Sequence, residues 1–415
     1  MAKSRCSEVI ASCTTAVKES GYRIVKRPIL FIIPSIVAAG AELQAMLQIC
    51  ELSRRGVPVR LMVLSVIVDA EVLDMAGLPA EHLCRLRNPS GILDRTFLKR
   101  LWRDLGRAAS FARRHDTGAV IAHLPPSHFF ARFLYLSQLL KGRRLKLFQY
   151  HHSEERRLNP ADSAEKRLFY AVDRFLARMC DYAHWHVSER VLADVAGGCF
   201  TRRNAIIHNT CNMTETGNVD GAKAIISTIR SGGRPYLVLL PGRLQARKGH
   251  QLLLAAFRRL LAAEKLSPGE IQLVFAGDGP HRAEIESEIA ASGLDSYATL
   301  LGAVPHQDLL ALFGLVDLVV IPSLIEGFGI VAIEALSRGA LVIASDAAGL
   351  DEIVRSGENG FQFPVGDEDA LFDRLCHVWR HRDEPLVDRI AMREEMETRF
   401  GTDAHIGRML SLLQG

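Results

Sequence analysis

Short runs of apolar residues alternate along the chain with longer segments of helical periodicity. The first run, residues 29–33, is continuously apolar and ends at Pro34, as is typical of a buried parallel strand. A glycine-containing turn follows, and then a helical pattern over residues 41–55. The same succession recurs along both halves. By this criterion we expect strands at residues 29–33, 59–68, 120–122, 145–149, 184–187, 205–207, 236–240, 271–276, 318–321, 341–344 and 360–363.

Alternation of strands and helices predicts parallel sheets with crossover helices. Residues 209–235, which are rich in Gly, Asn, Thr and Ser, interrupt the alternation and are interpreted as a connector. The length of 415 residues suggests two domains at about 100–200 residues each. The sequence therefore predicts an α/β protein with two doubly wound domains and a cleft between them, in which ligands bind at the carboxyl ends of the strands.

The composition is that of an ordinary globular protein, with 48% hydrophobic and 24% charged residues, and it argues against a disordered or disulfide-scaffold chain. The sequence has no run of eighteen apolar residues, so we expect no membrane-spanning helix. The eight cysteines include no C-x-x-C pair, as expected for reduced thiols in the cytosol. Residues 1–27 lack the continuous apolar core of a signal peptide and are interpreted as an extension.

The net charge of +4 conceals two blocks of opposite sign. Residues 1–208 hold 32 basic and 19 acidic residues, a formal charge of +13, whereas residues 209–415 hold 19 basic and 28 acidic residues, a formal charge of −9. A basic half indicates an anionic partner. We expect an anionic membrane surface or a phospholipid-linked substrate rather than nucleic acid, because the chain contains no RNP, zinc-finger or basic-zipper pattern.

Residues 97–115 show the clearest basic amphipathic pattern of this half. A helix of this kind can lie on anionic lipid. The competing interpretation is a surface helix whose apolar stripe packs on a sheet while its charges are solvated. We assign the stripe to sheet packing and reserve membrane contact for the basic face. The apolar positions are Leu98, Leu101, Trp102, Leu105, Ala108, Ala109 and Ala112, and the basic positions are Lys99, Arg100, Arg103, Arg107, Arg113 and Arg114.

Loops in the second half place glycines and polar residues directly after apolar strands. In residues 241–249, Gly242 allows a close turn, and Arg243 and Lys248 can place two cations beside a diphosphate. The competing interpretation of these cations is a pair of solvated surface charges. The next loop, Gly277-Asp278-Gly279-Pro280, lacks the third glycine of a dinucleotide fingerprint, which argues against a nicotinamide dehydrogenase.

A third loop, residues 322–329, leads into a helix that carries Glu334. Its glycines bring backbone N–H groups to a helix N-terminus, which is an anion site by geometry and dipole. A carboxylate such as Glu326 is unfavourable there unless a ligand uses it, and sugar hydroxyls are its natural donors. The competing interpretation is a first-turn carboxylate at Glu326 and a solvated helix face at Glu334. A fourth loop, residues 348–352, opens another helix.

These loops together resemble the retaining glycosyltransferases of family four, which have the GT-B fold. The resemblance rests on Gly242-Arg243-Leu244 with Lys248-Gly249, on Gly277-Asp278-Gly279-Pro280, and on Glu326 and Glu334, which reproduce the E-x7-E motif of the family. It covers the chain from about residue 28, with its specific motifs in the second half. It implies two Rossmann-like domains facing a cleft, with a nucleotide-diphosphate-sugar held by the C-terminal domain.

The resemblance also implies roles for individual residues. Arg243 and Lys248 would bind the donor diphosphate. Glu326 would lie against the donor sugar, and Glu334 would accept hydrogen bonds from the ribose. The other residues assigned to the donor are Gly40, Gly277, Gly279 and, through backbone N–H groups, Phe328, Gly329 and Ile330.

The first half matches the family more loosely. Ala39-Gly40-Ala41-Glu42 is similar to its Gly-Gly-x-Glu turn, with Ala39 in place of one glycine. His123 resembles the histidine that members place near the transferred sugar, and the competing interpretation is a satisfied histidine at a strand end. His151 and His152 resemble a second histidine-bearing loop.

The expected domain order follows from the strand pattern and the resemblance together. An extension (residues 1–27) precedes an N-terminal Rossmann-like acceptor-binding domain (residues 28–208). The connector (residues 209–235) leads to a C-terminal Rossmann-like domain that binds the nucleotide-sugar (residues 236–399). A final helix (residues 400–415) crosses back to the N-terminal domain.

The resemblance predicts a retaining, metal-independent glycosyltransferase that builds a cell-surface glycan or lipopolysaccharide, or glycosylates a lipid-linked acceptor, at the cytosolic membrane face. We expect no cofactor besides the donor substrate, and we interpret Asp367-Glu368-Asp369 as charge at a helix N-terminus rather than as a metal motif. The alternatives are a transferase with a soluble acceptor, such as a sugar phosphate, and an inactive GT-B subunit that only binds. The expected catalytic residues are His123, Arg243, Lys248 and Glu326.

Overall fold

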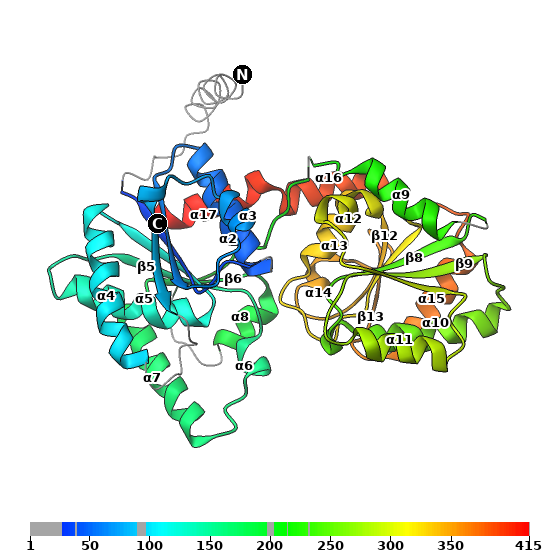
Figure 1. The fold of residues 1–415 in the computed structure, drawn as a ribbon, viewed down its shortest axis with the longest axis horizontal. Helices are drawn as coiled ribbons and strands as arrows, with labels where there is room; N and C mark the ends of the chain where they lie inside the picture. The colour runs from blue at the N-terminus through cyan, green and yellow to red at the C-terminus, as the bar shows by residue number, and fades with distance from the viewer. Residues whose placement is uncertain are drawn as a thin grey trace. The chain divides into compact units, whose positions relative to one another are not determined.

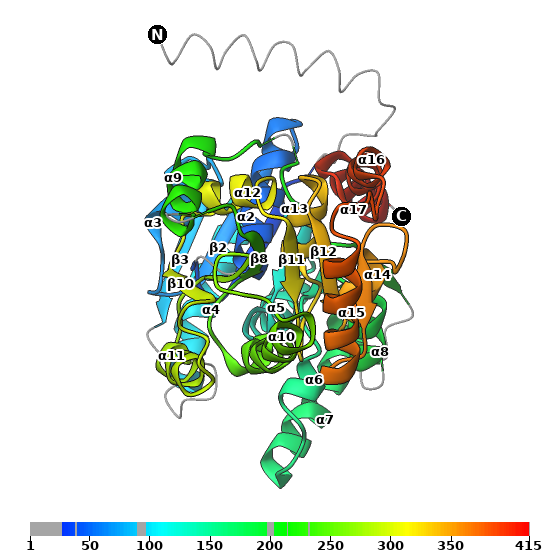
Figure 2. The ribbon, with the colours of Figure 1, turned by 90° about the vertical axis from the view of Figure 1, so that its right-hand side faces the viewer.

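The computed structural model describes residues 27–37, 40–88, 97–196, 203–213, 215–230 and 233–414. The chain divides into two compact units, called here unit 1 (residues 1–209 and 405–415) and unit 2 (residues 210–404) (Figure 1). Figure 2 shows the ribbon with unit 2 toward the viewer. Each unit contains one sheet, and the ladders between neighbouring strands are parallel throughout both sheets. The predicted class, with two Rossmann-like α/β domains, is therefore confirmed.

In unit 1 the described residues form a sheet with the strand order β3-β2-β1-β4-β5-β6-β7. Strand β1 (Ile29–Ile33) is fully buried because it pairs with β2 and β4 on its two sides, which explains its continuous apolar run. The other strands are β2 (Val59–Ser65), β3 (Leu83–Asn88), β4 (Ala119–His123), β5 (Lys146–His151), β6 (Ala183–His186) and β7 (Asn204–Ile206). The helices are α2 (Gly40–Arg54), α3 (Ala70–Asp74), η1 (Ala80–His82), α4 (Phe97–Arg114), α5 (Pro125–Leu139), α6 (Glu155–Leu158), α7 (Ala164–Cys180), α8 (Glu189–Ala196) and α17 (Thr402–Gln414).

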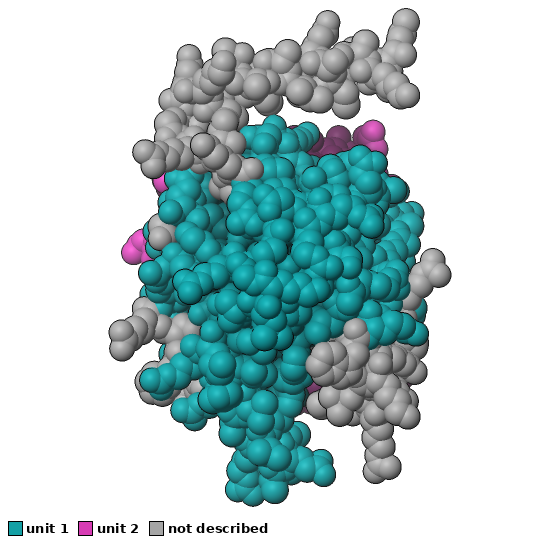
Figure 3. All heavy atoms as spheres, turned by 90° about the vertical axis from the view of Figure 1, so that its left-hand side faces the viewer, with its two compact units in different colours: residues 1–209, 405–415 teal, residues 210–404 magenta. Residues whose placement is uncertain are grey.

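Alternate strand residues of unit 1 point to opposite faces of the sheet. Leu30 and Ile32 join a core cluster with Leu105 of α4 and Phe130 of α5. Phe31 faces the other way, and its ring lies 5.7 Å from the ring of His123. Helix α5 contacts both α4 and α7, so these three helices cover one face. Helix α7 forms the lowest part of unit 1 in Figures 1 and 3.

Helix α4 (Phe97–Arg114) forms where the sequence predicts an amphipathic helix, at residues 97–115. Leu105, Ala108, Ala109 and Ala112 are buried against the sheet, which confirms sheet packing for this part of the stripe. The expectations for Leu98, Lys99, Arg100, Leu101 and Trp102 concern side chains outside the described part of the structure. The same holds for the whole of residues 1–26 and for Ala39.

In unit 2 the described strands follow the order β10-β9-β8-β11-β12-β13. Their inward side chains meet α10 and α15 in one hydrophobic cluster that includes Leu240, Phe257 and Phe275. The strands are β8 (Tyr236–Pro241), β9 (Ile271–Ala276), β10 (Ala298–Gly302), β11 (Leu318–Ile321), β12 (Leu341–Ser345) and β13 (Phe361–Phe363). The helices are α9 (Val219–Ile229), η2 (Ala246–Lys248), α10 (His250–Glu264), α11 (Arg282–Ala291), α12 (His306–Phe313), α13 (Ile330–Ser337), α14 (Leu350–Ile353), α15 (Glu368–Arg380) and α16 (Arg389–Phe400).

The residues interpreted as a connector contain helix α9, which the sequence analysis does not anticipate. Asn218 caps this helix by accepting from the N–H of Gly221, and Ala222 and Ile226 are its buried residues. The helix contacts α12 and belongs to unit 2, which begins at Thr210 rather than at residue 236. An eleven-residue helix with one short apolar stripe has a weak periodic signal, which explains why composition alone suggested a linker.

The end of the chain returns to unit 1. His405 accepts a hydrogen bond from Gln48 of α2 at 3.1 Å and donates through Nδ1 to the carbonyl oxygen of His208 at 2.6 Å. Lys146 of β5 donates to the carbonyl oxygen of Leu413 at 3.4 Å. The units divide between residues 404 and 405, five residues beyond the expected boundary. Among the described helices, none combines the length and apolar content needed to cross a membrane.

Candidate functional site

Lys248 and Glu326 meet at the carboxyl edge of the unit 2 sheet, although 78 residues separate them. Lys248 ends η2 after strand β8, and Glu326 lies in the loop between β11 and α13. Lys248 Nζ donates to Glu326 Oε2 at 2.5 Å, and Ser323 Oγ donates to the same oxygen at 3.1 Å. The two charged side chains are only 15% and 14% exposed, so water screens the pair less than an ordinary surface ion pair.

Glu326 stays ionised in this setting. Burial by itself raises the pKa of the carboxyl, but the charge and hydrogen bond of Lys248 outweigh burial, with help from Arg247 and the Ser323 hydroxyl. The pKa of Glu326 therefore lies below its ordinary value. The result is a fixed negative charge in contact with a fixed positive charge, an arrangement that can bind hydroxyl donors and an anion side by side.

Close backbone packing joins the loops that follow β8 and β9. A Cβ atom at Gly277 would lie 2.0 Å from the carbonyl oxygen of Gly242, and one at Gly279 would lie 2.4 Å from that of Leu244. The N–H of Leu244 donates to the carbonyl oxygen of Asp278 at 3.0 Å. Gly277 and Gly279 thus have a packing role in this structure. Their predicted contact with the donor stays a prediction.

Arg243 and Lys248 flank the same turn. Arg243 is exposed, and it forms no ion pair with any of the described residues. The side chain of Lys248 passes beside Gly242, where its Cε atom would lie 4.0 Å from a Cβ. The carbonyl oxygen of Arg247 accepts the N–H of Leu324 at 2.8 Å, which ties this turn to the loop that holds Glu326. One compact loop cluster therefore presents both cations.

Helix α13 begins directly after the Glu326 loop. Its N-cap, Gly329, has φ +96°, and a Cβ there would lie 2.4 Å from the side chain of Leu350. The N–H groups at the start of a helix favour an anion, and in α13 these begin at Ile330; the N–H of Ala332 already donates to the carbonyl oxygen of Gly329 at 2.9 Å. The ring of Phe328 is buried 5.8 Å from the ring of Phe400, which anchors the loop to α16. The predicted phosphate-facing amides thus lie next to Glu326 in the chain and in space.

Glu334 lies on α13 and is 7% exposed. His306, the first residue of α12, contacts its Oε1 through Nε2 at 2.9 Å. This hydrogen bond raises the pKa of His306 more than burial lowers it, so His306 favours the protonated form that donates to Glu334. Sequence reasoning missed His306, because a histidine at the start of a surface helix carries no motif. Its only sequence signal is its place directly after Pro305 at a helix start.

His123, at the end of β4, is completely buried in unit 1. Its Nδ1 lies 2.8 Å from Nε2 of His152, which follows β5, and the two rings are stacked. Burial, and then the neighbouring histidines led by His152, hold the pKa of His123 far below its ordinary value. Burial likewise lowers the pKa of His152 to about 3. The pair is therefore neutral at physiological pH and can hold or pass a proton without carrying charge.

The backbone next to His123 is strained. Leu124 has φ +69° and ψ +148°, values that a side chain with a Cβ rarely adopts. This conformation turns the chain abruptly from β4 into α5, which begins at Pro125. Strain of this kind costs about 1–3 kcal/mol and persists where the surroundings impose it, often beside functional groups. It fixes the position of His123 at the strand end.

The other residues expected in unit 1 lie apart from this pair. Gly40 is exposed and begins α2. His151 points to the opposite face of the sheet from His152, because the two are adjacent residues at the end of one strand. Its ring stacks on His184 and His186 instead.

The acidic run at residues 367–369 has the expected capping role. The side chain of Asp367 accepts from the N–H of Ala370 at 2.9 Å and caps α15. Glu368 and Asp369 both pair with Arg259 of α10. The run therefore starts a helix and ties α15 to α10.

Comparison with known proteins places the family signal in unit 2. Residues 223–391 match the family described as glycosyl transferases group 1. Alpha-D-kanosaminyltransferase of Streptomyces kanamyceticus is 32% identical over 161 residues, which are 39% of this chain and 38% of that protein. Phosphatidyl-myo-inositol mannosyltransferase of Mycobacterium leprae is 30% identical over 202 residues, 48% of this chain and 52% of that protein. The matched part of the chain thus spans about half or less of these curated relatives.

Solved structures resemble the chain over nearly its full length. Anabaena HepE in complex with UDP superposes with a TM-score of 0.75 at 19% identity, over 93% of this chain and 99% of that one. WaaG, described as a glycosyltransferase involved in lipopolysaccharide biosynthesis, gives a TM-score of 0.66 at 15% identity, over 93% and 100% of the two chains. At such identities the likeness establishes the fold, which is GT-B.

Proposed function

We propose that this chain, whose residues 223–391 match group 1 glycosyl transferases on a GT-B fold, is a glycosyltransferase that holds a nucleotide-diphosphate-sugar in unit 2. The observation that carries the proposal is the contact between Lys248 and Glu326 beside the N-terminus of α13. These groups match the two halves of such a donor: cations and amides for the diphosphate, and a carboxylate for the sugar hydroxyls. The HepE structures with UDP and with UDP-glucose support a donor of this class.

Breaking the bond between sugar and phosphate leaves positive charge at the anomeric carbon and negative charge on the departing diphosphate. Lys248, Arg243 and the first-turn amides of α13 stabilise the leaving diphosphate, and such preorganised electrostatics is usually the largest catalytic contribution. Glu326 accepts hydrogen bonds from the donor sugar. Glu334, held by His306, accepts hydrogen bonds from the ribose. The acceptor oxygen then bonds to the anomeric carbon, and its proton passes to the oxygen of the departing diphosphate.

We further propose that the reaction retains the configuration of the sugar and needs no metal at the diphosphate. Retention rests on the resemblance of the E-x7-E motif formed by Glu326 and Glu334. Independence from metal at this point rests on the two cations, which supply the charge that a divalent ion supplies elsewhere. In unit 1 we assign His123 a role in transfer of the sugar, because the neutral His123–His152 pair can exchange a proton.

An acceptor at an anionic membrane fits the surface of unit 1. Helix α7 exposes an apolar stripe at helical spacing, in which Leu168 and Phe175 are 67% and 64% exposed and Val172 and Met179 are 43% and 54% exposed. A helix with an exposed apolar stripe and basic neighbours can insert into a lipid interface. The basic neighbours on α7 are Lys166, Arg167, Arg174 and Arg178.

Helix α4 adds a basic groove to the same layer of helices. The groove has a volume of about 460 Å³, and Arg103, Arg107 and Arg114 line it together with Ser110. Because α5 contacts both α4 and α7, the groove and the stripe belong to one helical layer. We propose that the acceptor is a lipid-linked or cell-surface glycan precursor at such a membrane. The relatives named for phosphatidyl-myo-inositol and for lipopolysaccharide support this class of acceptor.

Liposome flotation distinguishes an acceptor at the membrane from a soluble acceptor. Leu168→Ser combined with Phe175→Ser should abolish binding to vesicles that contain anionic lipid, while Ile390→Ser, an exposed apolar residue of α16, should leave it intact. A soluble acceptor such as a sugar phosphate would be favoured if the unaltered chain, the double variant and Ile390→Ser all floated equally. The same conclusion would follow if none of the three proteins floated at low salt.

The donor assignment is tested by screening nucleotide-sugars for release of free nucleotide by the purified chain. At least one nucleotide-sugar should be consumed, and Lys248→Ala should abolish the release. Lys223→Ala, which removes an exposed lysine of α9, is the matched control. Binding of a nucleotide-sugar without any release, even with acceptor lipid extracts, would identify an inactive binding subunit.

A further inference from the structure

A chain of hydrogen bonds fixes the protons of a second group of buried histidines in unit 1. Asp181 is completely buried and accepts from the guanidinium of Arg132 at 2.6 Å, so it is ionised. Its Oδ2 lies 2.9 Å from Nε2 of His184, which must therefore carry the proton. Nδ1 of His184 is then an acceptor, and it lies 3.1 Å from Nε2 of His151.

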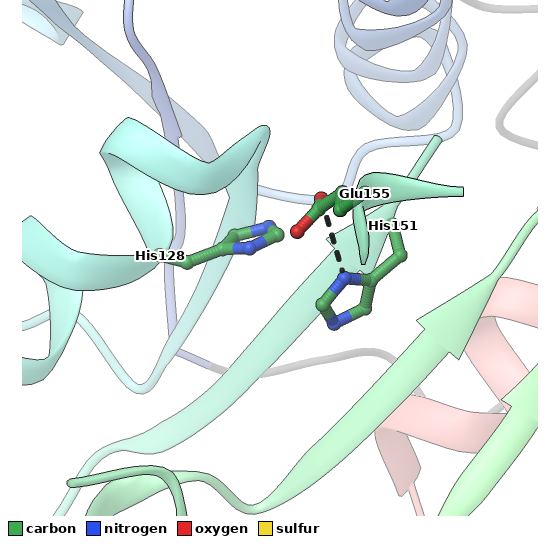
Figure 4. Close-up of side chains that lie close together, drawn as sticks. All are labelled: His128, His151 and Glu155. Atoms are coloured by element: carbon green, nitrogen blue, oxygen red, sulfur yellow. Dashed lines mark ion pairs between the residues drawn. The ribbon is translucent and has the colours of Figure 1, made fainter. Parts of the chain in front are cut away.

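It follows that His151 donates through Nε2 and carries a bare lone pair on Nδ1. This Nδ1 is buried and has no hydrogen-bond partner among the described residues, and the side chain is 4% exposed. The atom points at Glu155, whose Oε1 lies 3.5 Å away and is also buried without a hydrogen-bond partner there (Figure 4). Two buried polar atoms without hydrogen-bond partners thus face each other at a distance that is long for a direct hydrogen bond.

His128 completes the group from α5. Its Nε2 lies 3.1 Å from the carbonyl oxygen of Tyr150, a bond in which the ring must donate, so its Nδ1 is left with a lone pair. His128, His151 and Glu155 each offer one ligand atom, and these atoms lie within 4.8 Å of one another. In Figure 4 the carboxylate of Glu155 reaches between the two imidazole rings.

The charges around this group favour a cation. Two further carboxylates, those of Asp173 and Asp194, act on Glu155, together with the guanidinium of Arg132. Arg132 itself pairs with Asp173 and Asp181, so these surroundings carry more negative than positive charge.

We propose that His128, His151 and Glu155 bind a divalent metal ion of the zinc class in unit 1. Two imidazole nitrogens and one carboxylate oxygen form a donor set that zinc uses with an open fourth position. Ligands of a tetrahedral zinc ion lie about 3.3 Å apart, close to the observed separation of His151 Nδ1 and Glu155 Oε1.

The surrounding residues orient these ligands in the way metal sites require. The Asp181–His184 pair holds the ring of His151 in one tautomer, as outer-shell carboxylates do for zinc-bound histidines. The site is built from residues of unit 1 alone and shares none with the proposed donor site of unit 2, so the metal-independent chemistry proposed for unit 2 is unchanged. The ion would tie the start of α5 to the end of β5 and to α6.

The test is metal binding by the full chain with any affinity tag removed. After treatment with a chelator, the protein is titrated with Co²⁺ and then Zn²⁺, and the bound ion is counted by mass spectrometry of the metal. We expect one Co²⁺ per chain with visible absorption of a low-coordinate site, displaced by one equivalent of Zn²⁺. Glu155→Gln should weaken binding at least tenfold while the chain stays folded, because its amide can donate to His151 Nδ1.

Glu154→Gln is the matched control, since it changes the neighbouring carboxylate, which pairs with Arg157 instead. It should bind Co²⁺ like the unaltered chain, and so should Lys248→Ala. The proposal is overturned if the unaltered chain binds no Co²⁺ or Zn²⁺. It is equally overturned if Glu155→Gln binds as tightly as Glu154→Gln, which would assign any bound ion to another place.

Discussion

The carboxyl edges of the two sheets carry opposite kinds of polar side chain. In unit 2 the edge holds ionised groups, the pair of Lys248 and Glu326, with Arg243 exposed beside them. In unit 1 the edge holds buried imidazoles kept neutral by desolvation. One group of imidazoles lies on the face toward α2 and α17, and the other lies on the face toward α5 and α7. The first group is His123, His152 and His405, and the second is His128, His151 and His186.

The same strand topology therefore supports two kinds of chemistry. Fixed charges and the N-terminus of α13 in unit 2 suit an anion such as a diphosphate. Neutral rings with spare lone pairs in unit 1 suit protons, hydroxyl groups or a metal ion. The difference also predicts how each unit responds to acid, because neutral buried histidines and ionised acids titrate in different ranges.

Acid should unfold unit 1 before unit 2, and this is the largest effect that we expect. The folded state keeps the histidines neutral, with pKa values of about 3 for His128 and His152 and about 4 for His186 and His405. The unfolded chain protonates each of them below about pH 6.5, so unit 1 loses about 1.4 kcal/mol per such histidine for each further pH unit. Unit 2 holds one such histidine, His250, with a pKa of about 4, and the depressed pKa of Glu326 contributes stability that is lost only below its unfolded value of 4.5.

Tryptophan fluorescence can separate the two units. Trp185, which His184 and His186 flank in the sequence, is buried in unit 1, and Trp379 lies in unit 2. In Trp379→Phe the signal comes from unit 1, and it should change at a higher pH than the signal of the Trp102→Phe/Trp185→Phe variant. Coincident transitions, or an earlier one in unit 2, would contradict the comparison.

Removing the charges of unit 2 should have the next largest effect. Lys248→Ala and Glu326→Gln should each lower turnover of the donor by about 10²–10⁴-fold, because each removes a preorganised charge from the reacting centre. Circular dichroism should show an intact fold in both. Glu288→Gln, an exposed carboxylate of α11, is the control and should retain full turnover. Full turnover in either site variant would reject the assignment.

Gly277→Ala tests the backbone packing that supports the charged edge. The added Cβ would lie 2.0 Å from the carbonyl oxygen of Gly242, so the loops must separate, and we expect a loss of about 2–4 kcal/mol in the free energy of unfolding. Gly106→Ala, in open space on α4, should raise that free energy by about 0.5–1 kcal/mol. Chemical denaturation measures both, and a neutral Gly277→Ala would show that the loops have room to move.

The smallest effect is expected at His306. His306→Gln keeps a hydrogen-bond donor near Glu334 but removes the positive charge. The KM for the donor should rise about threefold to tenfold with kcat nearly unchanged, as for a group that only binds. An equal fall of kcat and kcat/KM would instead place His306 at the reacting centre.

The sequence predicts every central strand and two of the four edge strands, β7 and β13. Eleven expected strands are present with bounds that differ by at most three residues. Strands β3 and β10, one at the edge of each sheet, were missed. In β3, Arg85 and Arg87 interrupt the apolar residues, and every residue of β10 is partly exposed. A search for continuous apolar runs finds strands that are buried on both faces and can overlook an edge strand whose run is interrupted by charges or left partly exposed.

The same contrast holds for the polar groups. Lys248 and Glu326 could be proposed from sequence because glycines with fixed spacing surround them, and the structure brings them into contact. The histidines of unit 1 come from α5, β4, β5, β6 and α17, and no spacing along the chain connects them. Their neutrality depends on burial, which only the assembled sheet provides. His306 depends in the same way on the packing of α12 against α13.

The most direct test of the central claim is hydrogen–deuterium exchange of the full chain with and without a saturating nucleoside diphosphate. The account predicts slower exchange at the amides of residues 242–249 and 329–332 in unit 2, and no such change in Lys248→Ala at the same concentration. Saturable binding that protects unit 1 while these segments exchange as before would contradict the account.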